Sequence, residues 1–245
     1  MKRISKKSEV QDLTCHCIST YHAEGLDSCI QAVYSTILSN KIKFPLLEFA
    51  ATELFQHIKT GDQLSFLNQI QSRKTIGGNV ITGIILQKRL KKHFKQTINK
   101  ATEYIGAADA WYVCDIIGER VWGFSLLQDP DKTIKEILRL SAHPNQWVIR
   151  SLGAGAHYSI KKGLDQMHVK TLFDILLSMA NTTNKEIRQG VGWAAKTTAK
   201  FHPEIINDFK EQIQQTEKIK PWFRTKIKTG LDRGRYKELR IKNEE

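Results

Sequence analysis

The chain has 245 residues, 40% of them apolar, which is enough for one large domain with a hydrophobic core or for an array of repeats. Its formal net charge of +13 favours a polyanionic partner, nucleic acid before an anionic membrane surface. The basic residues 1–7 precede no apolar stretch, and no run of 18 apolar residues exists. We therefore expect neither a signal peptide nor a membrane-spanning helix, and a cytoplasmic protein.

The first hundred residues show helical periodicity and few strand signals. Pro45 suits the first turn of a helix, and Asp62 is expected to cap the helix that follows it. Gly77 and Gly78 predict the clearest internal break in this part of the chain. Helices are predicted over residues 27–38, 63–71, 79–95 and 98–105, with another beginning near Pro45.

Residues 88–95 combine an apolar face with a basic one. Lys88, Arg89 and Lys92 on this stretch are candidates for contacts with DNA phosphates. The alternative, to which we give equal weight, is a solvated helix end, where cations also complement the helix dipole.

The remainder of the chain continues as helices separated by short breaks. Asp109 is expected to cap a helix that begins near Trp111. Residues 1–8 and 232–245 are too charged for a core and are expected to be flexible tails. Further helices are predicted over residues 133–140, 146–161, 169–180, 185–200, 204–214 and 221–231.

These helices pair at intervals of about 36–46 residues, the period of HEAT-like repeats. The sequence therefore predicts an all-α fold, an α-α superhelix of HEAT-like repeats in a single domain over residues 1–245.

Three tryptophans occupy related places in successive helix pairs. Trp111 and Trp147 lie near the start of the second helix of a pair, and Trp193 lies within the next one. Second helices line the concave face of an α-solenoid, so the three indoles are candidates for one groove. Asp115 is one helical turn after Trp111 and points to the same side. The alternative is that each tryptophan belongs to the core of its own hairpin, because tryptophan is usually mostly buried.

Cations near the tryptophans favour the groove. Arg150 and Lys196 each follow a tryptophan by three residues, Arg188 shares the helix of Trp193, and Lys161 ends the helix of Trp147. Basic groups beside aromatic rings are typical of a surface that follows a phosphate backbone. We therefore take Arg150, Trp147, Arg188, Lys196 and Lys161 as candidate DNA-binding residues.

Other catalytic and metal motifs are absent. The cysteines are at positions 15, 17, 29 and 114, and Cys15, His16 and Cys17 are too close together for the usual zinc spacing. There is no Gly-x-Ser-x-Gly, His-Glu-x-x-His or P-loop motif. We expect buried free thiols, no metal and no cofactor.

The sequence resembles the HEAT-like-repeat alkylpurine DNA glycosylases of the AlkD type, the DNA alkylation repair family. Residues 111–115 are similar to the W-x-x-x-D helix of that family, and residues 147–150 to its W-x-x-R helix. Residues 187–196 are similar to its I-G-W segment, with Val191 in place of the isoleucine. The resemblance covers about residues 45–230, and no single motif is specific.

The resemblance implies a metal-free monofunctional glycosylase, a hydrolase of N-glycosyl bonds that removes N3- or N7-alkylated purines from duplex DNA without flipping the base. It implies that Trp111 and Trp193 pack against the sugar and backbone, and that Arg150 holds a phosphate. Asp115 would stabilise the oxocarbenium-like sugar and orient water. We expect such an enzyme to act as a monomer.

Two other functions remain open. A non-catalytic protein on the same scaffold would bind branched or damaged DNA and needs only the basic face. A protein-interaction solenoid is the third hypothesis, and the charge of +13 argues against it.

Overall fold

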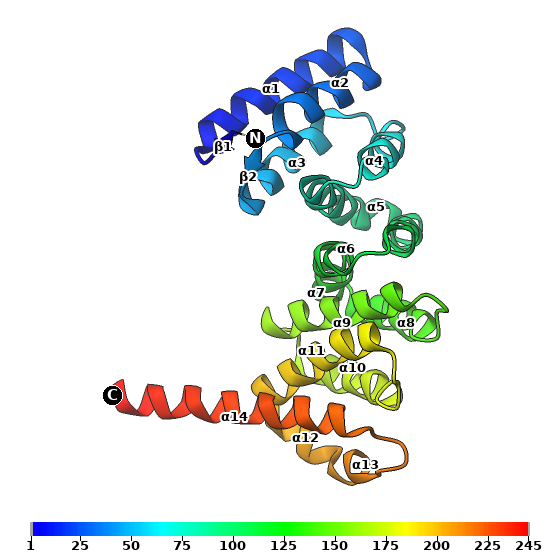
Figure 1. The fold of residues 1–245 in the computed structure, drawn as a ribbon, viewed down its shortest axis with the longest axis vertical. Helices are drawn as coiled ribbons and strands as arrows, with labels where there is room; N and C mark the ends of the chain where they lie inside the picture. The colour runs from blue at the N-terminus through cyan, green and yellow to red at the C-terminus, as the bar shows by residue number, and fades with distance from the viewer. Residues whose placement is uncertain (1, 245) are drawn as a thin grey trace. The chain divides into compact units, whose positions relative to one another are not determined.

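The computed structural model describes the backbone of residues 2–244 and the side chains through residue 234. The described chain is all-α, as the sequence predicts, apart from two strands of two residues each (Figure 1). It divides within α5 into two compact units, Met1–Tyr104 and Ile105–Glu245, each of which is described by itself. The single domain expected over residues 1–245 stays a prediction. None of the described helices is both long enough and apolar enough to cross a bilayer.

The N-terminal unit is a cluster of helices around an apolar core. Helix α1 packs against α2 and α3, and α2 packs against α4. Strand β1 (Arg3–Ile4) pairs in parallel with β2 (Lys41–Ile42), and Ile4 is buried. The flexible tail expected over residues 1–8 stays a prediction. The helical elements are α1 (Lys7–Glu24), α2 (Leu26–Ala32), the π-helical η1 (Val33–Leu38), α3 (Phe44–His57), α4 (Gln63–Ser72) and α5 (Ile76–Ala108).

Two local predictions in this unit have different outcomes. Asp62 is the N-cap residue of α4, as predicted, but its side chain makes no cap bond, and its carboxylate accepts the hydroxyl of Tyr21 at 2.6 Å. Gly77 and Gly78 lie in the first turn of α5 and do not break the chain. Helix α5 is instead interrupted at His93, whose φ and ψ of −133° and 44° are not helical.

The C-terminal unit is built from helix pairs in two layers. In one layer, α6 packs against α9, α9 against α11 and α11 against α14 (Figure 1). This layer comprises α6 (Trp111–Gly118), the π-helical η2 (Glu119–Gly123), α9 (Gln146–Lys161), α11 (Lys185–Phe201) and α14 (Pro221–Glu244). The other comprises α7 (Phe124–Gln128), α8 (Pro130–Leu140), α10 (Gln166–Ser178), α12 (Pro203–Asp208) and α13 (Lys210–Gln214).

Helices α9 and α11 cross at glycines, which lets their backbones touch. A Cβ atom on Gly190 would lie 2.3 Å from the carbonyl oxygen of Arg150, and one on Gly153 would lie 2.2 Å from Gly190. Since real Cβ atoms do not approach so closely, only glycine permits this crossing. The crossing brings the first turns of both helices within side-chain reach of each other.

Hydrogen bonds between residues one repeat apart align the starts of these helices. The Asn145 side chain donates to the Gly106 carbonyl at 3.1 Å, and the Asn184 side chain donates to Gln146 Oε1 at 2.7 Å. Asn145 and Asn184 also cap α9 and α11 by accepting backbone N–H groups. The first turns of α9 and α11 therefore lie along one edge of the unit.

Helix α14 is longer than the sequence predicts. It continues to Glu244, whereas the predicted helix ends at residue 231. The flexible tail expected over residues 232–245 stays a prediction. Lysine, arginine, glutamate and leucine, which recur in this segment, are good helix formers. Lys228 also pairs with Asp232 one turn later, at 3.0 Å.

Candidate functional site

Arg150 on α9 lies at the centre of a charged cluster contributed by three neighbouring helices. Its Nε and Nη2 atoms donate to the two carboxylate oxygens of Asp115 on α6, at 3.1 and 2.9 Å. Its Nη1 atom donates to Glu186 Oε2 on α11, at 2.7 Å. The side chains of Arg150, Asp115 and Glu186 are 11%, 18% and 19% exposed. These ion pairs are therefore shielded from most of the solvent screening that weakens surface pairs.

The two carboxylates hold Arg150 as a fixed cation. Burial lowers its pKa, but the hydrogen bonds and negative charges of Asp115 and Glu186 outweigh that effect, so its pKa is raised above the ordinary value. The cluster contains two acids and one base, so its formal charge is −1.

Trp111 is the first residue of α6, one turn before Asp115. Its side chain is 57% exposed, and the centre of its ring is 5.7 Å from the guanidinium carbon of Arg150. Trp111 and Asp115 therefore lie on the same side of α6, as their spacing predicts. An indole this exposed contributes little to the core and offers an aromatic face to a ligand.

Trp193 lies on α11 and stacks on His157 of α9, with ring centres 4.0 Å apart and planes 24° apart. His157 Nδ1 is 2.6 Å from the hydroxyl of Thr197, which fixes the imidazole. Burial, followed by the charges of Lys161 and Lys196, lowers the pKa of His157 to about 4. The imidazole is therefore neutral near pH 7 and holds the plane of Trp193 by stacking without adding charge.

Trp193 and Arg150 line the same shallow hollow. Its volume is about 250 Å³, and its other lining residues are Gln189, Lys196 and Lys226. The stem of Lys226 lies across α11 at Gly192, where a Cβ atom would be 3.0 Å from Lys226 Cγ. Of the residues predicted from the sequence, Arg150 and Trp193 thus line one hollow. Asp115 and Trp111 lie against Arg150.

A second hollow adjoins the first and shares Gln189 and Lys226 with it. Its volume is about 160 Å³, and Lys185, Arg188 and Trp222 complete its lining. The guanidinium of Arg188 lies 5.7 Å from the ring centre of Trp222. No acidic side chain lines either hollow, among the residues that the structure describes.

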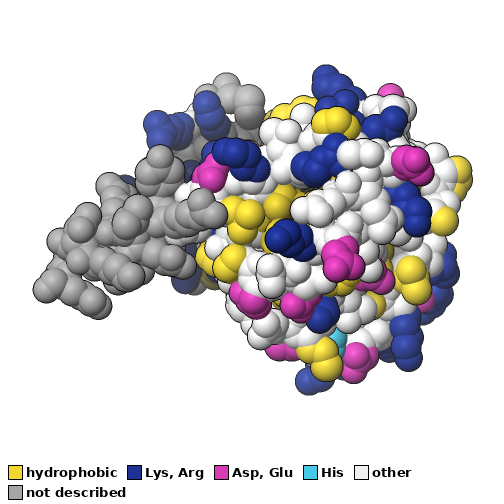
Figure 2. Space-filling model, turned by 90° about the horizontal axis from the view of Figure 1, so that it is seen from below, with side chains coloured by type: hydrophobic (Ala, Val, Ile, Leu, Met, Phe, Trp, Pro, Cys, Tyr) yellow, Lys and Arg dark blue, Asp and Glu magenta, His cyan; other side chains and the backbone are white. Residues whose placement is uncertain are grey.

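Cations are crowded along these hollows. Burial lowers the pKa of Lys196, and the charges of Arg233 and Lys226 lower it further. On the face shown in Figure 2, lysine and arginine side chains are interspersed with acidic ones. The hollows, more than the overall charge, therefore mark where a polyanion would bind.

The family model for DNA alkylation repair enzymes matches residues 42–226. The chain belongs to this family. This supports a function in DNA repair, with DNA as the partner. The matched range includes every residue of the cluster around Arg150 and of both hollows. Comparison with curated proteins and with solved structures gives no match.

Several predicted DNA contacts are placed differently in this repair-family chain. The indole N–H of Trp147 donates to Asp109 Oδ1 at 2.6 Å, and this bond holds the turn before α6. Asp109 therefore does not cap α6 as expected; it has a φ of +47°, and Ala110 is the N-cap residue. Lys161 is exposed at the end of α9 and lines neither hollow.

Arg89 is not available to DNA, which corrects its assignment as a phosphate contact. It is 3% exposed in the N-terminal unit, and its guanidinium donates to Gln63 at 2.5 Å and to Gln96 at 2.7 Å. Its neighbours Lys88 and Lys92 are exposed on the same helix. Position 89 lies on the buried side of α5, where the arginine donates to the buried amide of Gln63 and to the exposed side chain of Gln96.

The cysteines are free, and Cys15 is exposed, contrary to the expectation that all are buried. Burial raises the pKa of Cys114, which precedes Asp115, to about 12, because desolvation outweighs the opposing charge of Arg150. The Cys114 thiol is therefore protonated and takes no part as a nucleophile.

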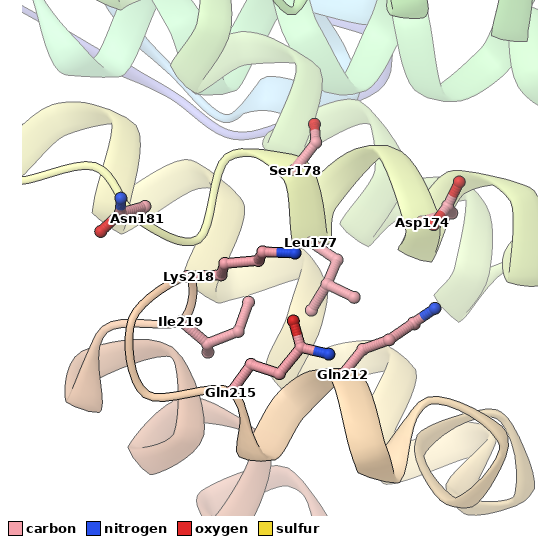
Figure 3. A pocket seen from close by; sticks show the side chains of 8 residues that line it. All are labelled: Asp174, Leu177, Ser178, Asn181, Gln212, Gln215, Lys218 and Ile219. Carbon is pink, nitrogen blue, oxygen red and sulfur yellow. The ribbon is translucent and has the colours of Figure 1, made fainter.

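A larger hollow of about 530 Å³ lies between α10 and α13 (Figure 3). It contains none of the residues predicted from the sequence and none of the cluster around Arg150. Its lining is mixed in charge, with Asp174 and Lys218 among neutral side chains. Size therefore does not identify the functional site in this unit.

Reasoning from the sequence missed Glu186 and His157. Glu186 is the second residue of α11, where an acid is ordinarily explained by the helix dipole. A signal for its role does exist, because Asp115 and Arg150 are 35 residues apart and Arg150 and Glu186 are 36 residues apart. Contacts at the repeat interval are a way to find such partners.

Proposed function

We propose that the protein is a monofunctional alkylpurine DNA glycosylase that removes N3- and N7-alkylated purines from duplex DNA without flipping the base. The observation that carries the proposal is Asp115, fixed by a bidentate bond to Arg150 beside the exposed Trp111 and the cationic hollow of Trp193. A carboxylate beside a polyanion site is unfavourable unless a cation meets it during the reaction.

The chemistry of the lesion provides that cation. Alkylation at N3 or N7 makes the purine positively charged, so the base leaves with its bonding electrons when the bond between C1′ and N9 breaks. Positive charge then develops on the sugar, and a carboxylate with restricted access to water stabilises it electrostatically. Asp115 also accepts a hydrogen bond from the water that attacks C1′, and this bond orients the water.

The two indoles are suited to the sugar side of the reaction. Trp111 presents an open face, while Trp193 is held in plane by His157. Aromatic faces attract a cationic sugar or base through their quadrupole. Neutral damaged bases gain none of this stabilisation, so we expect poor activity on them.

Cations of the two hollows would hold the DNA backbone. Lys196, Lys226 and Arg188 line them without acidic neighbours in the lining. Arg150 was expected to hold a phosphate, but three of its N–H groups donate to Asp115 and Glu186. Its principal role in the proposal is therefore to orient Asp115, with two N–H groups left for another acceptor.

The test is release of 7-methylguanine from methylated duplex DNA under single-turnover conditions. Asp115→Asn should lower the rate roughly 100- to 1000-fold while DNA binding is kept. Asp174→Asn is the matched control, since it removes an exposed acid from the hollow of Figure 3. Equal rates for Asp115→Asn and the wild type would refute the assignment.

A second candidate is a non-catalytic protein that binds branched DNA. The hollow of Lys185, Arg188 and Trp222 favours this function, because its cations and its indole could bind a DNA backbone without any carboxylate. Tight binding to a four-way junction, with no base released from methylated DNA, would select this function.

A further inference from the structure

We propose that Glu186 is a charge-balancing residue that keeps the reaction site negative while Arg150 holds Asp115 in place. The inference rests on the proposed glycosylase function. It assigns a role in selecting cationic substrates to an acid that the sequence motifs do not include.

The bond between Arg150 and Asp115 has two effects on the carboxylate. A bidentate guanidinium orients a carboxylate well, with bonds here of 3.1 and 2.9 Å. It also cancels the charge of that carboxylate, and a neutral pair has little attraction for a cationic sugar. Orientation and charge are therefore in conflict if Asp115 and Arg150 act alone.

Glu186 removes this conflict. It accepts from the remaining terminal nitrogen of Arg150 at 2.7 Å, so one cation is shared by two carboxylates. The formal charge of the cluster becomes −1, and Asp115 keeps its orientation. No ion pair joins Glu186 to Lys185, Lys196 or Lys226 in the described part of the chain, so these lysines do not compete with Arg150 for its carboxylate.

The place of Glu186 in the repeats is also unusual. Trp111, Trp147 and Trp222 lie in the first turns of α6, α9 and α14, and Glu186 takes the corresponding place in α11. Its backbone N–H is capped by Asn184 at 2.9 Å, so its carboxylate is not needed for capping and is free to contact Arg150. An acid at the start of a helix also stabilises that helix through its dipole. The experiment therefore has to separate this structural role from the charge-balancing role.

The substitution Glu186→Gln makes this separation, since glutamine keeps an oxygen that accepts from Arg150 but removes the charge. The single-turnover rate of 7-methylguanine release should fall roughly 10- to 50-fold. Affinity for unmodified duplex DNA should rise about two- to five-fold, because a negative charge beside the phosphates is gone. A purely structural defect would instead lower both the release rate and the affinity for DNA.

Two further variants complete the experiment. Glu186→Asp keeps the charge and should recover most of the rate. Glu211→Gln removes an exposed acid from the first turn of α13 in the same unit and should change neither the rate nor the affinity. All variants are compared at one salt concentration, with thermal unfolding followed by circular dichroism.

The outcomes separate this inference from the function beneath it. If Glu186→Gln releases 7-methylguanine at the wild-type rate, the charge-balancing role is overturned and the proposed glycosylase function stands. Loss of rate together with loss of affinity, or failure of Glu186→Gln to fold when Glu186→Asp folds, assigns Glu186 to the structure of α11 and also overturns the role. If the wild-type protein releases no 7-methylguanine, both proposals fail.

Discussion

The two units of this protein each place an arginine in a sheltered position on a central helix, with opposite results. Arg89 in the N-terminal unit donates to the neutral amides of Gln63 and Gln96, and burial lowers its pKa. Arg150 in the C-terminal unit donates to two carboxylates, which raise its pKa despite burial. A buried arginine that donates to amides stabilises the fold, whereas an arginine shared by two partly exposed acids leaves a net negative charge on the cluster.

The comparison shows why charge in the sequence does not locate a site by itself. Arg89 belongs to the most basic stretch of the chain, and it is the one cation there that points into the core. Arg150 is preceded by three uncharged residues, yet it organises the site. What distinguishes the two arginines is the chemistry of their partners.

The largest expected effect comes from removing each arginine in turn. Arg150→Ala leaves two carboxylates without their cation and Asp115 without its orientation, so release of 7-methylguanine should fall about 100-fold or more. Arg89→Ala should lower the free energy of unfolding by about 1–3 kcal/mol, because the buried amide of Gln63 loses its donor. Its rate per folded molecule should stay within about two-fold of wild type.

Urea unfolding and single-turnover release, measured on both variants, check this pair of expectations. The distinction between the two arginines breaks down if Arg89→Ala loses as much rate as Arg150→Ala when each is corrected for the folded fraction.

The next effect concerns the crossing that brings Arg150 and Glu186 together. Gly190→Ala places a Cβ atom 2.3 Å from the Arg150 carbonyl and forces α9 and α11 apart, which should cost about 3 kcal/mol or more. Gly61→Ala in the N-terminal unit is the matched control, since its Cβ atom has nothing within 4 Å. Thermal unfolding of the two variants measures the difference, and similar melting temperatures would show that the crossing tolerates a side chain.

Local patterns predicted much of the fold. Helix α9 spans Gln146–Lys161, the predicted range, because Asn145 caps it and apolar residues recur at helical spacing. Asp62 occupies the predicted N-cap position of α4, whereas Asp109 does not occupy that of α6. Neither carboxylate makes a cap bond, and both accept from residues distant in the sequence, Tyr21 and Trp147. Long-range partners decide such cases, and a single sequence does not reveal them.

In the site too, contacts within one helix could be predicted and contacts between helices could not. Trp111 and Asp115 could be predicted to share a side because both belong to one helix. The contact between Arg150 and Glu186 depends on the register between two helices, which the glycine crossing sets. Register of this kind requires knowing which backbones touch, and the periodicity of a single helix carries no such information. The repeat interval, 35 and 36 residues between these partners, is the one hint that the sequence offers.

Two histidines of the C-terminal unit allow a smaller test, because their protonation should affect stability with opposite sign. The pKa of His157 is lowered to about 4 by burial, against an ordinary value of 6.5. Its contribution to stability is full above pH 6.5 and is lost as pH falls toward 4, by up to about 2 kcal/mol. Urea unfolding of the wild type and His157→Gln at pH 7 and pH 4.5 should show this loss in the wild type alone.

The smallest effect is expected at His168, which joins α10 to α8. Its Nδ1 contacts Asp165 and its Nε2 is 3.1 Å from Asp131, and the bond to Asp165 is the main reason that its pKa is raised. The stabilisation is therefore complete below pH 6.5 and is lost as pH rises through the raised value, the reverse of His157. For a pair this close to the surface, about 0.5 kcal/mol is expected. His168→Gln should reduce the free energy of unfolding at pH 5.5 and leave it unchanged at pH 8.5, and an equal loss at both would assign His168 to packing instead of charge.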